Sequence, residues 1–197
     1  MGVNLNMEAL EKKHGLTEST AKSVMLGAGI VVKGLTFDTA WKYTKILGAT
    51  NGGNKLTIKP IVVDLELDGK LVKVKGTTVK TGEEATLETN LAEVTEDNIM
   101  MAVLGAKGED KGGFSEIVSK ETIEENDYLE NLAFIGHTLD NNPIIVLFDW
   151  ALCTSGLDFE AKDKNQSTIK VVFDCYADLA QGNLTKLPYH IYTKKAV

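Results

Sequence analysis

The chain has 197 residues, of which 43% are apolar and 25% charged, and its formal net charge is −7 at pH 7. These values are typical of one soluble globular domain with enough apolar surface for a stable core. No uninterrupted apolar run approaches the roughly 20 residues of a membrane-spanning helix, so we expect no contact with a membrane. All 21 basic residues are Lys, and an acidic chain without Arg is poorly suited to binding nucleic acid.

The first part of the chain combines a polar segment with short strand signals. Residues 1–24 are polar, with one possible helical turn at 7–13, and they predict a flexible N-terminal arm without a secretory signal. Residues 30–33 predict a first strand, and residues 37–46 predict another strand or an extended loop. Residues 48–54 are rich in glycine and predict a turn, because glycine tolerates positive φ angles.

Residues 56–67 give the longest strand signal in the chain. Pro60 lacks a backbone N–H group, so it belongs at a sheet edge or a bulge. Asp68 and Gly69 form a typical hairpin turn, which predicts a returning strand at 71–74 and a loop at 76–82.

Residues 84–91 alternate polar and apolar side chains, which predicts a strand buried on one face only. A short helix should follow, with Thr95 as its N-cap, two acids in its first turn and Gly105 as the left-handed residue that ends it. Its apolar stripe joins residues four apart, Ile99 with Val103 and Met100 with Leu104. So short a helix must dock on a sheet to be stable.

The second half of the chain predicts further antiparallel strands. Residues 107–113 predict a flexible loop, and the acidic stretch 116–130 predicts a solvated strand or edge. Residues 129–139 and 143–152 predict a hairpin, whose second strand is apolar enough to be covered on both faces. Alternation at 168–178 predicts another half-buried strand, and 187–192 a short strand or arm.

Residues with catalytic or metal-binding potential are scattered. The three histidines, His14, His137 and His190, have no partner at ligand spacing, and no nucleophile elbow or phosphate-binding loop occurs. Cys153 and Cys175 fall on opposite faces of their predicted strands, so we expect free thiols. We expect no enzymatic activity, metal or cofactor, although the many acids leave a carboxylate pair for acid/base chemistry open as an alternative.

The order of the turns and strands resembles the major tail tube proteins of long-tailed, non-contractile bacteriophages, or a prophage copy of one. The resemblance covers residues 26–178. It is carried by the Leu-Gly-Ala-Gly entry at Leu26, the Gly-x-Thr-x-Gly-Gly segment at Gly48, the Asp68-Gly69 turn and the Thr-Glu-Asp-Asn start of the helix at Thr95.

This resemblance implies a mainly β fold of two packed antiparallel sheets, sandwich-like or barrel-like, with one short flanking α-helix. It implies residues 25–187 as the tail-tube domain, between an N-terminal arm at 1–24 and a C-terminal arm at 188–197. Six copies would form a ring, and stacked rings would form the tube of the virion tail, assembled in the cytoplasm of the bacterial host. Tape-measure, tail-tip and tail-terminator proteins would be its partners, and DNA would pass through during ejection without specific binding.

The same resemblance suggests which residues face the tube interior and which stack rings. The candidate lumen-lining residues are acids on the solvent-exposed strand faces: Asp64, Glu66, Glu84 and Glu88. A shift of one residue in strand register would turn these side chains to the outer face instead. The candidate ring-stacking loops contain Gly48, Thr50, Gly52, Gly53, Lys107, Gly108, Gly112 and Gly113. Two other readings stay open: another ring-forming tail component, such as a terminator or a contractile-system tube, and a monomeric β-barrel that binds a small molecule.

Overall fold

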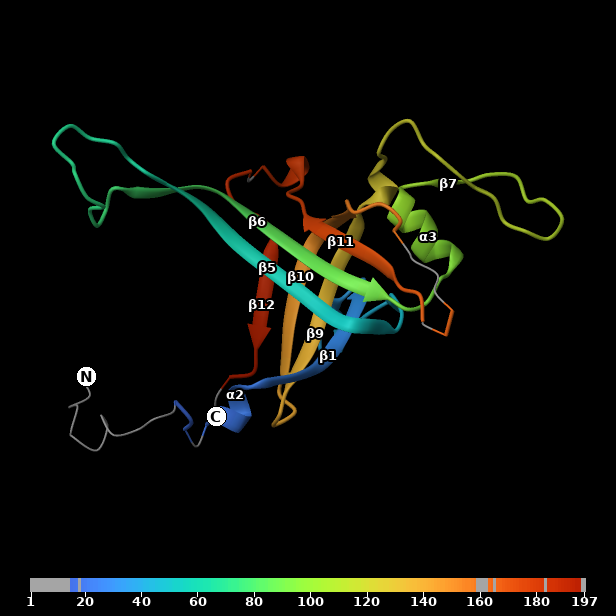
Figure 1. The fold of residues 1–197 in the computed structure, drawn as a ribbon, viewed down its shortest axis with the longest axis horizontal. Coiled ribbons are helices and arrows are strands. Elements are labelled where there is room, and N and C mark those ends of the chain that lie inside the picture. The colour runs from blue at the N-terminus through green and yellow to red at the C-terminus, as the bar shows by residue number, and fades with distance from the viewer. Residues whose placement is uncertain (1–14, 18, 159–162, 165, 183, 196–197) are drawn as a thin grey trace.

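A computed structural model describes residues 15–17, 19–158, 163–164, 166–182 and 184–195 (Figure 1). It confirms the predicted fold class: the protein is mainly β, with antiparallel layers packed in a sandwich-like manner and one flanking α-helix. The helical turn predicted at 7–13 lies outside the described residues.

One large antiparallel sheet contains most of the strands. Along the sheet its order is β4 (Lys45–Ile46), β1 (Met25–Lys33), β9 (Leu129–Thr138), β10 (Pro143–Cys153), β11 (Ile169–Cys175), β6 (Thr78–Leu91) and β5 (Thr50–Asp64), with β12 (Tyr189–Thr193) also paired to β10. Two small sheets pair β2 (Thr36–Phe37) with β3 (Trp41–Lys42), and β7 (Ala106–Lys107) with β8 (Ile117–Val118). The helical segments are α2 (Thr20–Ser23), α3 (Glu96–Val103) and the 3-10 turns η1 (Glu125–Asp127) and η2 (Leu179–Gln181).

Strand β10 is the place where the large sheet divides into two layers. One edge of β10 pairs with β9 over most of its length. The other edge is shared, because residues 144–148 pair with β12 whereas residues 151–153 pair with β11. Strands β11, β6 and β5 therefore leave the plane of β1, β9 and β10 and cross over it diagonally (Figure 1).

The main hydrophobic core lies between these two layers. Its largest fully buried side chains come from both layers: Leu87, Leu91, Leu132, Phe148, Ile169, Val171 and Phe173. A second, smaller cluster contains Val32, Leu35, Ala133, Ile145 and Leu147. Because neighbouring residues of β10 belong to different clusters, this strand is covered on both faces, as its apolar sequence predicted.

The alternation predicted at residues 84–91 is confirmed. Ala85, Leu87, Thr89 and Leu91 are buried, and the residues between them face outward. The same holds for β11, in which Ile169, Val171, Phe173 and Cys175 are buried. The hairpin predicted between 129–139 and 143–152 is also confirmed as β9 and β10.

The turn predicted at Asp68 and Gly69 is confirmed, with Lys70 N donating a hydrogen bond to Leu67 O at 3.0 Å, but the strand predicted to return directly after it is wrong. Residues 71–74 form no strand; β6 begins at Thr78, so residues 65–77 form one long loop between β5 and β6. Asp64 explains the difference, because its carboxylate accepts a hydrogen bond from Thr77 Oγ1 at 2.7 Å and pairs with Lys70 Nζ at 2.7 Å. These contacts close the loop at its base, and strand pairing resumes only after Thr77.

The turn predicted at residues 48–54 is also wrong. Strand β5 already begins at Thr50, and its register with β6 shifts between Thr50 and Asn54. Gly52 and Gly53 have φ angles of 91° and 84°, so the positive φ that suggested a turn is absorbed in a bulge of the strand. Pro60 lies on β5, the last strand of the sheet, which confirms its predicted edge position.

Helix α3 is capped as predicted, but its docked face is only partly the predicted one. Thr95 Oγ1 accepts a hydrogen bond from Asn98 N at 3.3 Å. The fully buried residues are Asn98 and Ala102; Ile99 of the predicted stripe packs against the core, whereas Val103 is 40% exposed. The Asn98 amide explains this rotation, because it donates hydrogen bonds to Leu47 O at 3.2 Å and to Glu93 O at 3.0 Å.

The predicted role of Gly105 at the end of this helix is wrong as well. Leu104 is the left-handed residue, with φ of 49°, and Gly105 N donates to Met100 O. Gly105 has a different reason to be glycine: a Cβ atom there would lie 2.8 Å from Cγ2 of Ile117. The close approach of the β7–β8 hairpin to the helix end therefore requires the missing side chain.

Both cysteine thiols are free and buried. The prediction that they fall on opposite faces is wrong, because Cys153 and Cys175 belong to the same core cluster. Burial raises the pKa of both thiols, that of Cys175 to about 12. They are therefore inert core side chains at neutral pH.

Thr89 offers a direct test of the core. It is fully buried, and its hydroxyl has no hydrogen-bond partner, so its desolvation is uncompensated. We expect Thr89→Val to raise the free energy of unfolding by about 1 kcal/mol in urea denaturation, because it removes that polar group at nearly constant shape. The matched control is Thr86→Val on the outward face of the same strand, for which we expect a change within about 0.5 kcal/mol. A loss of stability in Thr89→Val would contradict the assignment.

Candidate functional site

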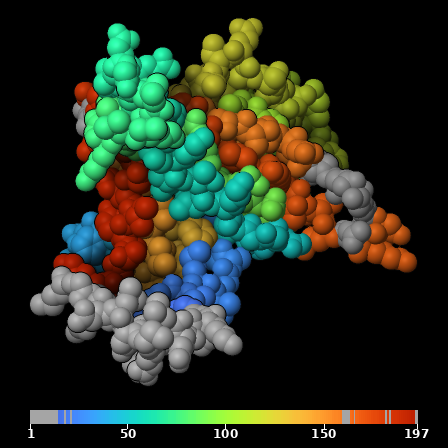
Figure 2. Space-filling view, turned by 60° about the vertical axis from the view of Figure 1, so that its left-hand side comes forward, coloured from blue at the N-terminus to red at the C-terminus, as the bar shows by residue number. Residues whose placement is uncertain are grey.

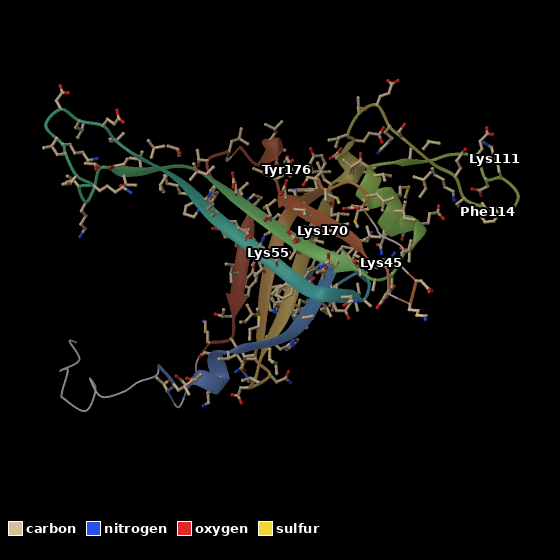
Figure 3. The ribbon with its side chains drawn as sticks, viewed as in Figure 1. Lys45, Lys55, Lys111, Phe114, Lys170 and Tyr176 are labelled. Atoms are coloured by element: carbon tan, nitrogen blue, oxygen red, sulfur yellow. The ribbon has the colours of Figure 1, made fainter. Side chains whose placement is uncertain are left out.

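The outward face of the β5–β6–β11 layer is the polar, solvent-exposed face that the sequence predicted. Glu84 and Glu88 of β6 both point outward on it. Each acid has a lysine beside it: Lys59 is opposite Glu84, Lys55 is opposite Glu88, and Lys170 Nζ lies 3.1 Å from Glu88 Oε1. Figure 3 shows Lys55 and Lys170 on this layer. This face therefore alternates charges of both signs, instead of presenting the uniformly acidic surface expected from the acids alone.

The other two candidate lumen residues lie at the base of the β5–β6 loop. Asp64 ends β5, and its hydrogen bonds from Lys70 and then Thr77 hold the pKa of its carboxyl below the usual range. Glu66 is exposed in the loop itself. The structure thus brings Glu84 and Glu88 together on one face, with Asp64 and Glu66 farther along the same hairpin.

The candidate ring-stacking residues form two separate groups. The first group, Gly48, Thr50, Gly52 and Gly53, lies at the bulged start of β5 beside the end of β6. The second group, Lys107, Gly108, Gly112 and Gly113, belongs to the hairpin formed by β7 and β8. This hairpin lies beside α3, where Lys107 Nζ is 3.7 Å from Glu96 Oε1, and it carries the exposed ring of Phe114 near its tip (Figure 3).

The most prominent surface feature is one that the sequence did not predict. The end of the β5–β6 hairpin projects far from the body (Figure 1) and stands out from the rest of the surface in the space-filling view (Figure 2). Its loop exposes apolar side chains, with Leu71 at 95% and Val72 at 71% exposure. The adjoining strand ends add further exposed apolar residues: Ile61, Val62, Val63 and Val79.

A small cavity of about 260 Å³ lies on the body near the ends of β9, β10 and β11. Three aromatic residues line it, Tyr128, Trp150 and Tyr176, together with Glu125 and Asp178. Partial burial raises the pKa of the Tyr176 phenol, and the charge of Asp174 adds to that shift. The sequence did not reveal this cavity, because its residues come from segments far apart in the chain.

Outside these surfaces, the described part of the chain has few side chains placed for catalysis or metal binding. His190 Nε2 lies 3.3 Å from Asp149 Oδ1, while His137 belongs to another strand, β9. No group of three or more His, Cys, Asp or Glu side chains suited to a metal ion occurs among the described residues. None of the described helices has the length and apolar character needed to cross a bilayer.

No protein-family model matches the sequence, and no curated protein sequence matches it significantly.

Glu83 joins the hairpin to the C-terminal strand. Its Oε1 accepts a hydrogen bond from Leu187 N at 2.6 Å, and its other oxygen forms an ion pair with Lys80. Both contacts hold the pKa of Glu83 below its ordinary value of 4.5. The contact with Lys80 has the larger effect, and the hydrogen bond from Leu187 N adds to it. The carboxylate therefore stabilises the attachment of the segment that leads into β12.

We expect Glu83→Gln to lower the free energy of unfolding by about 1 kcal/mol at neutral pH, because it weakens a charge-assisted hydrogen bond. A lowered folded-state pKa gives stabilisation that is present above pH 4.5 and is lost as the pH falls through the folded-state value. The difference between wild type and variant in urea unfolding should therefore narrow as the pH falls below 4.5. Glu84→Gln, at an exposed neighbouring acid, is the control and should change stability by a few tenths of a kcal/mol at most. A pH-independent difference would contradict this role for the charge.

Proposed function

We propose that the protein is a structural subunit that assembles with copies of itself into hexameric rings stacked as a bacteriophage tail tube, the conduit for DNA ejection. The observation that carries the proposal is the projecting β5–β6 hairpin with its exposed apolar loop. The resemblance of the element order to major tail tube proteins supports the same function. Its virion location and its tape-measure, tail-tip and tail-terminator partners are part of this proposal.

The hairpin favours assembly because an exposed apolar loop is unfavourable in an isolated molecule. Contiguous apolar patches on a protein surface usually mark sites of association. The loop has no role in the core of its own subunit, since Leu71 is almost fully exposed and residues 71–74 belong to no sheet. A neighbouring copy that covered Leu71 and Val72 would remove this surface from water.

The free edge of β5 supports the same conclusion. This strand is the last of the large sheet, and its outer edge spans fifteen residues. A long unpaired edge is a template for pairing with another chain, and closure of a ring removes such edges. Pro60 has no backbone N–H group, so it interrupts the row of hydrogen-bond donors along this edge at one position only.

The mixed charge on the outward face suits a channel through which DNA passes. Glu84, Glu88 and Asp174 would repel phosphate, while Lys55, Lys59 and Lys170 on the same face balance their charge. Such a surface offers no cluster of uncompensated positive charge for DNA to bind. On this proposal the face lines the lumen.

The alternative of a small-molecule β-barrel is less well supported. Its ligand would occupy the interior, but the space between the two layers is filled by buried side chains such as Leu87, Phe148 and Phe173. Another ring-forming tail component would share the fold and the free edge, and would differ in the length of the assembly.

Electron microscopy of the purified protein at rising concentration tests the proposal. We expect hollow tubes; single rings would favour the other ring-forming component, and persistent monomers would overturn self-assembly. The double variant Leu71→Ser/Val72→Ser should raise the concentration needed for assembly at least about tenfold, since it removes two exposed apolar contacts. Ile123→Ser, at an exposed apolar residue outside the hairpin, is the control and should assemble like the wild type.

A charge-reversal variant tests the lumen assignment. Glu84→Lys/Glu88→Lys turns the outward face strongly positive, so we expect tubes to assemble while DNA ejection from phage carrying the variant slows, because phosphate is retained. Glu84→Gln/Glu88→Gln separates loss of negative charge from gain of positive charge. Unchanged ejection in the Lys variant would place this face outside the lumen.

A further inference from the structure

The aromatic cavity on the body carries a combination of side chains that tube assembly does not explain. Tyr128 directly precedes β9, Trp150 lies in β10, and Tyr176 directly follows β11. The rings of Tyr128 and Tyr176 meet edge to face, with their centroids 5.5 Å apart. Tyr176 N donates a hydrogen bond to Trp150 O at 2.9 Å, so sheet pairing holds the backbones of these two residues together. Figure 3 shows Tyr176 at this end of the sheet.

Two carboxylates accompany the three rings. Glu125, in η1, and Asp178, the residue before η2, both line the cavity. Asp178 Oδ1 accepts a hydrogen bond from Ala180 N at 2.9 Å, which fixes the side chain at the rim. Within the described part of the chain neither carboxylate forms an ion pair, and no lysine lines the cavity. Apart from the hydrogen bond that Asp178 accepts from Ala180 N, no cationic side chain among the described residues compensates these negative charges.

This arrangement selects ligands by charge. The faces of Trp and Tyr attract cations through their quadrupole, and neighbouring carboxylates strengthen that attraction. An anion would be repelled, and a neutral apolar ligand would desolvate the carboxylates without replacing their water. The volume of about 260 Å³ equals roughly nine water molecules at about 30 Å³ each. That space suits one alkylammonium head and is smaller than a typical drug-sized pocket.

We propose that this cavity binds an alkylammonium group, held over the rings of Tyr128, Trp150 and Tyr176 and paired with Glu125 and Asp178. The cation has two possible sources with the same chemistry. It is either a free small amine or a side chain of a second copy, which would be Lys because the sequence contains no Arg. The site does not depend on the proposed tube function, since its chemistry is complete within one subunit.

The chain has two tryptophans, so Trp41→Phe leaves Trp150 as the only one. In this background we expect choline chloride to change the Trp150 fluorescence in a saturable manner, with sodium chloride keeping ionic strength constant. The neutral isostere 3,3-dimethylbutan-1-ol should bind about tenfold more weakly, because it lacks the charge that the rings and carboxylates attract. Absence of saturation, or equal binding of the alcohol, would overturn the proposal.

Variants in the same background assign the site to its residues. Glu125→Gln keeps the shape of the side chain and should weaken choline binding several-fold, and Tyr176→Leu should weaken it about tenfold. Tyr43→Leu, at a tyrosine that does not line the cavity, is the matched control and should leave binding unchanged. Circular dichroism would verify that each variant is folded. Choline binding unchanged in both folded cavity variants would overturn the site.

Sedimentation at rising protein concentration, with and without saturating choline, separates the two sources. If a lysine of a second copy fills the cavity, choline should lower self-association, and Glu125→Gln should do the same. If self-association is unaffected while choline still binds, the cavity is a site for a free amine. Both results support an ammonium site. Tube assembly is tested separately, by the hairpin variants.

Discussion

The fold depends on how strand β10 shares one of its edges. Backbone groups that leave water must find partners, and on this edge residues 144–148 find them in β12 while residues 151–153 find them in β11. A sheet cannot continue flat when one strand has two neighbours on the same side. The β11–β6–β5 layer is therefore turned across β1, β9 and β10, and the core forms between layers of one continuous sheet.

Local patterns in the sequence predicted the parts of the fold that local chemistry decides. The alternation at 84–91 and 169–175 predicted the buried faces, because one-sided burial imposes a period of two. The positions of the β5–β6 loop and of the helix face were not predictable in this way. They depend on single polar contacts between distant residues: Asp64 with Thr77 closes the loop, and Asn98 with Leu47 O sets the rotation of α3.

The same distinction applies to the candidate sites. Alternation placed Glu84 and Glu88 on an outward face, but it could not supply the lysines beside them. Their pairing with Lys59 and Lys55 follows from a register that lies between two irregularities, one in β5 before Asn54 and one in β6 at Thr81. The aromatic cavity was beyond sequence reasoning for a related reason, since its walls meet only after three separate strands have paired.

The pairing order also has a consequence for how the chain folds during synthesis. Val31 of β1 pairs with Phe134, about a hundred residues later, and β6 waits for β11 for nearly as long. The β5–β6, β9–β10, β2–β3 and β7–β8 pairs form from neighbouring segments, whereas the β1–β9 and β6–β11 pairs are non-local, and non-local pairing makes folding slow. A nascent chain thus leaves β1 and β6 without their partner strands until β9 and β11 have left the ribosome, which makes that interval its period of greatest exposure to aggregation.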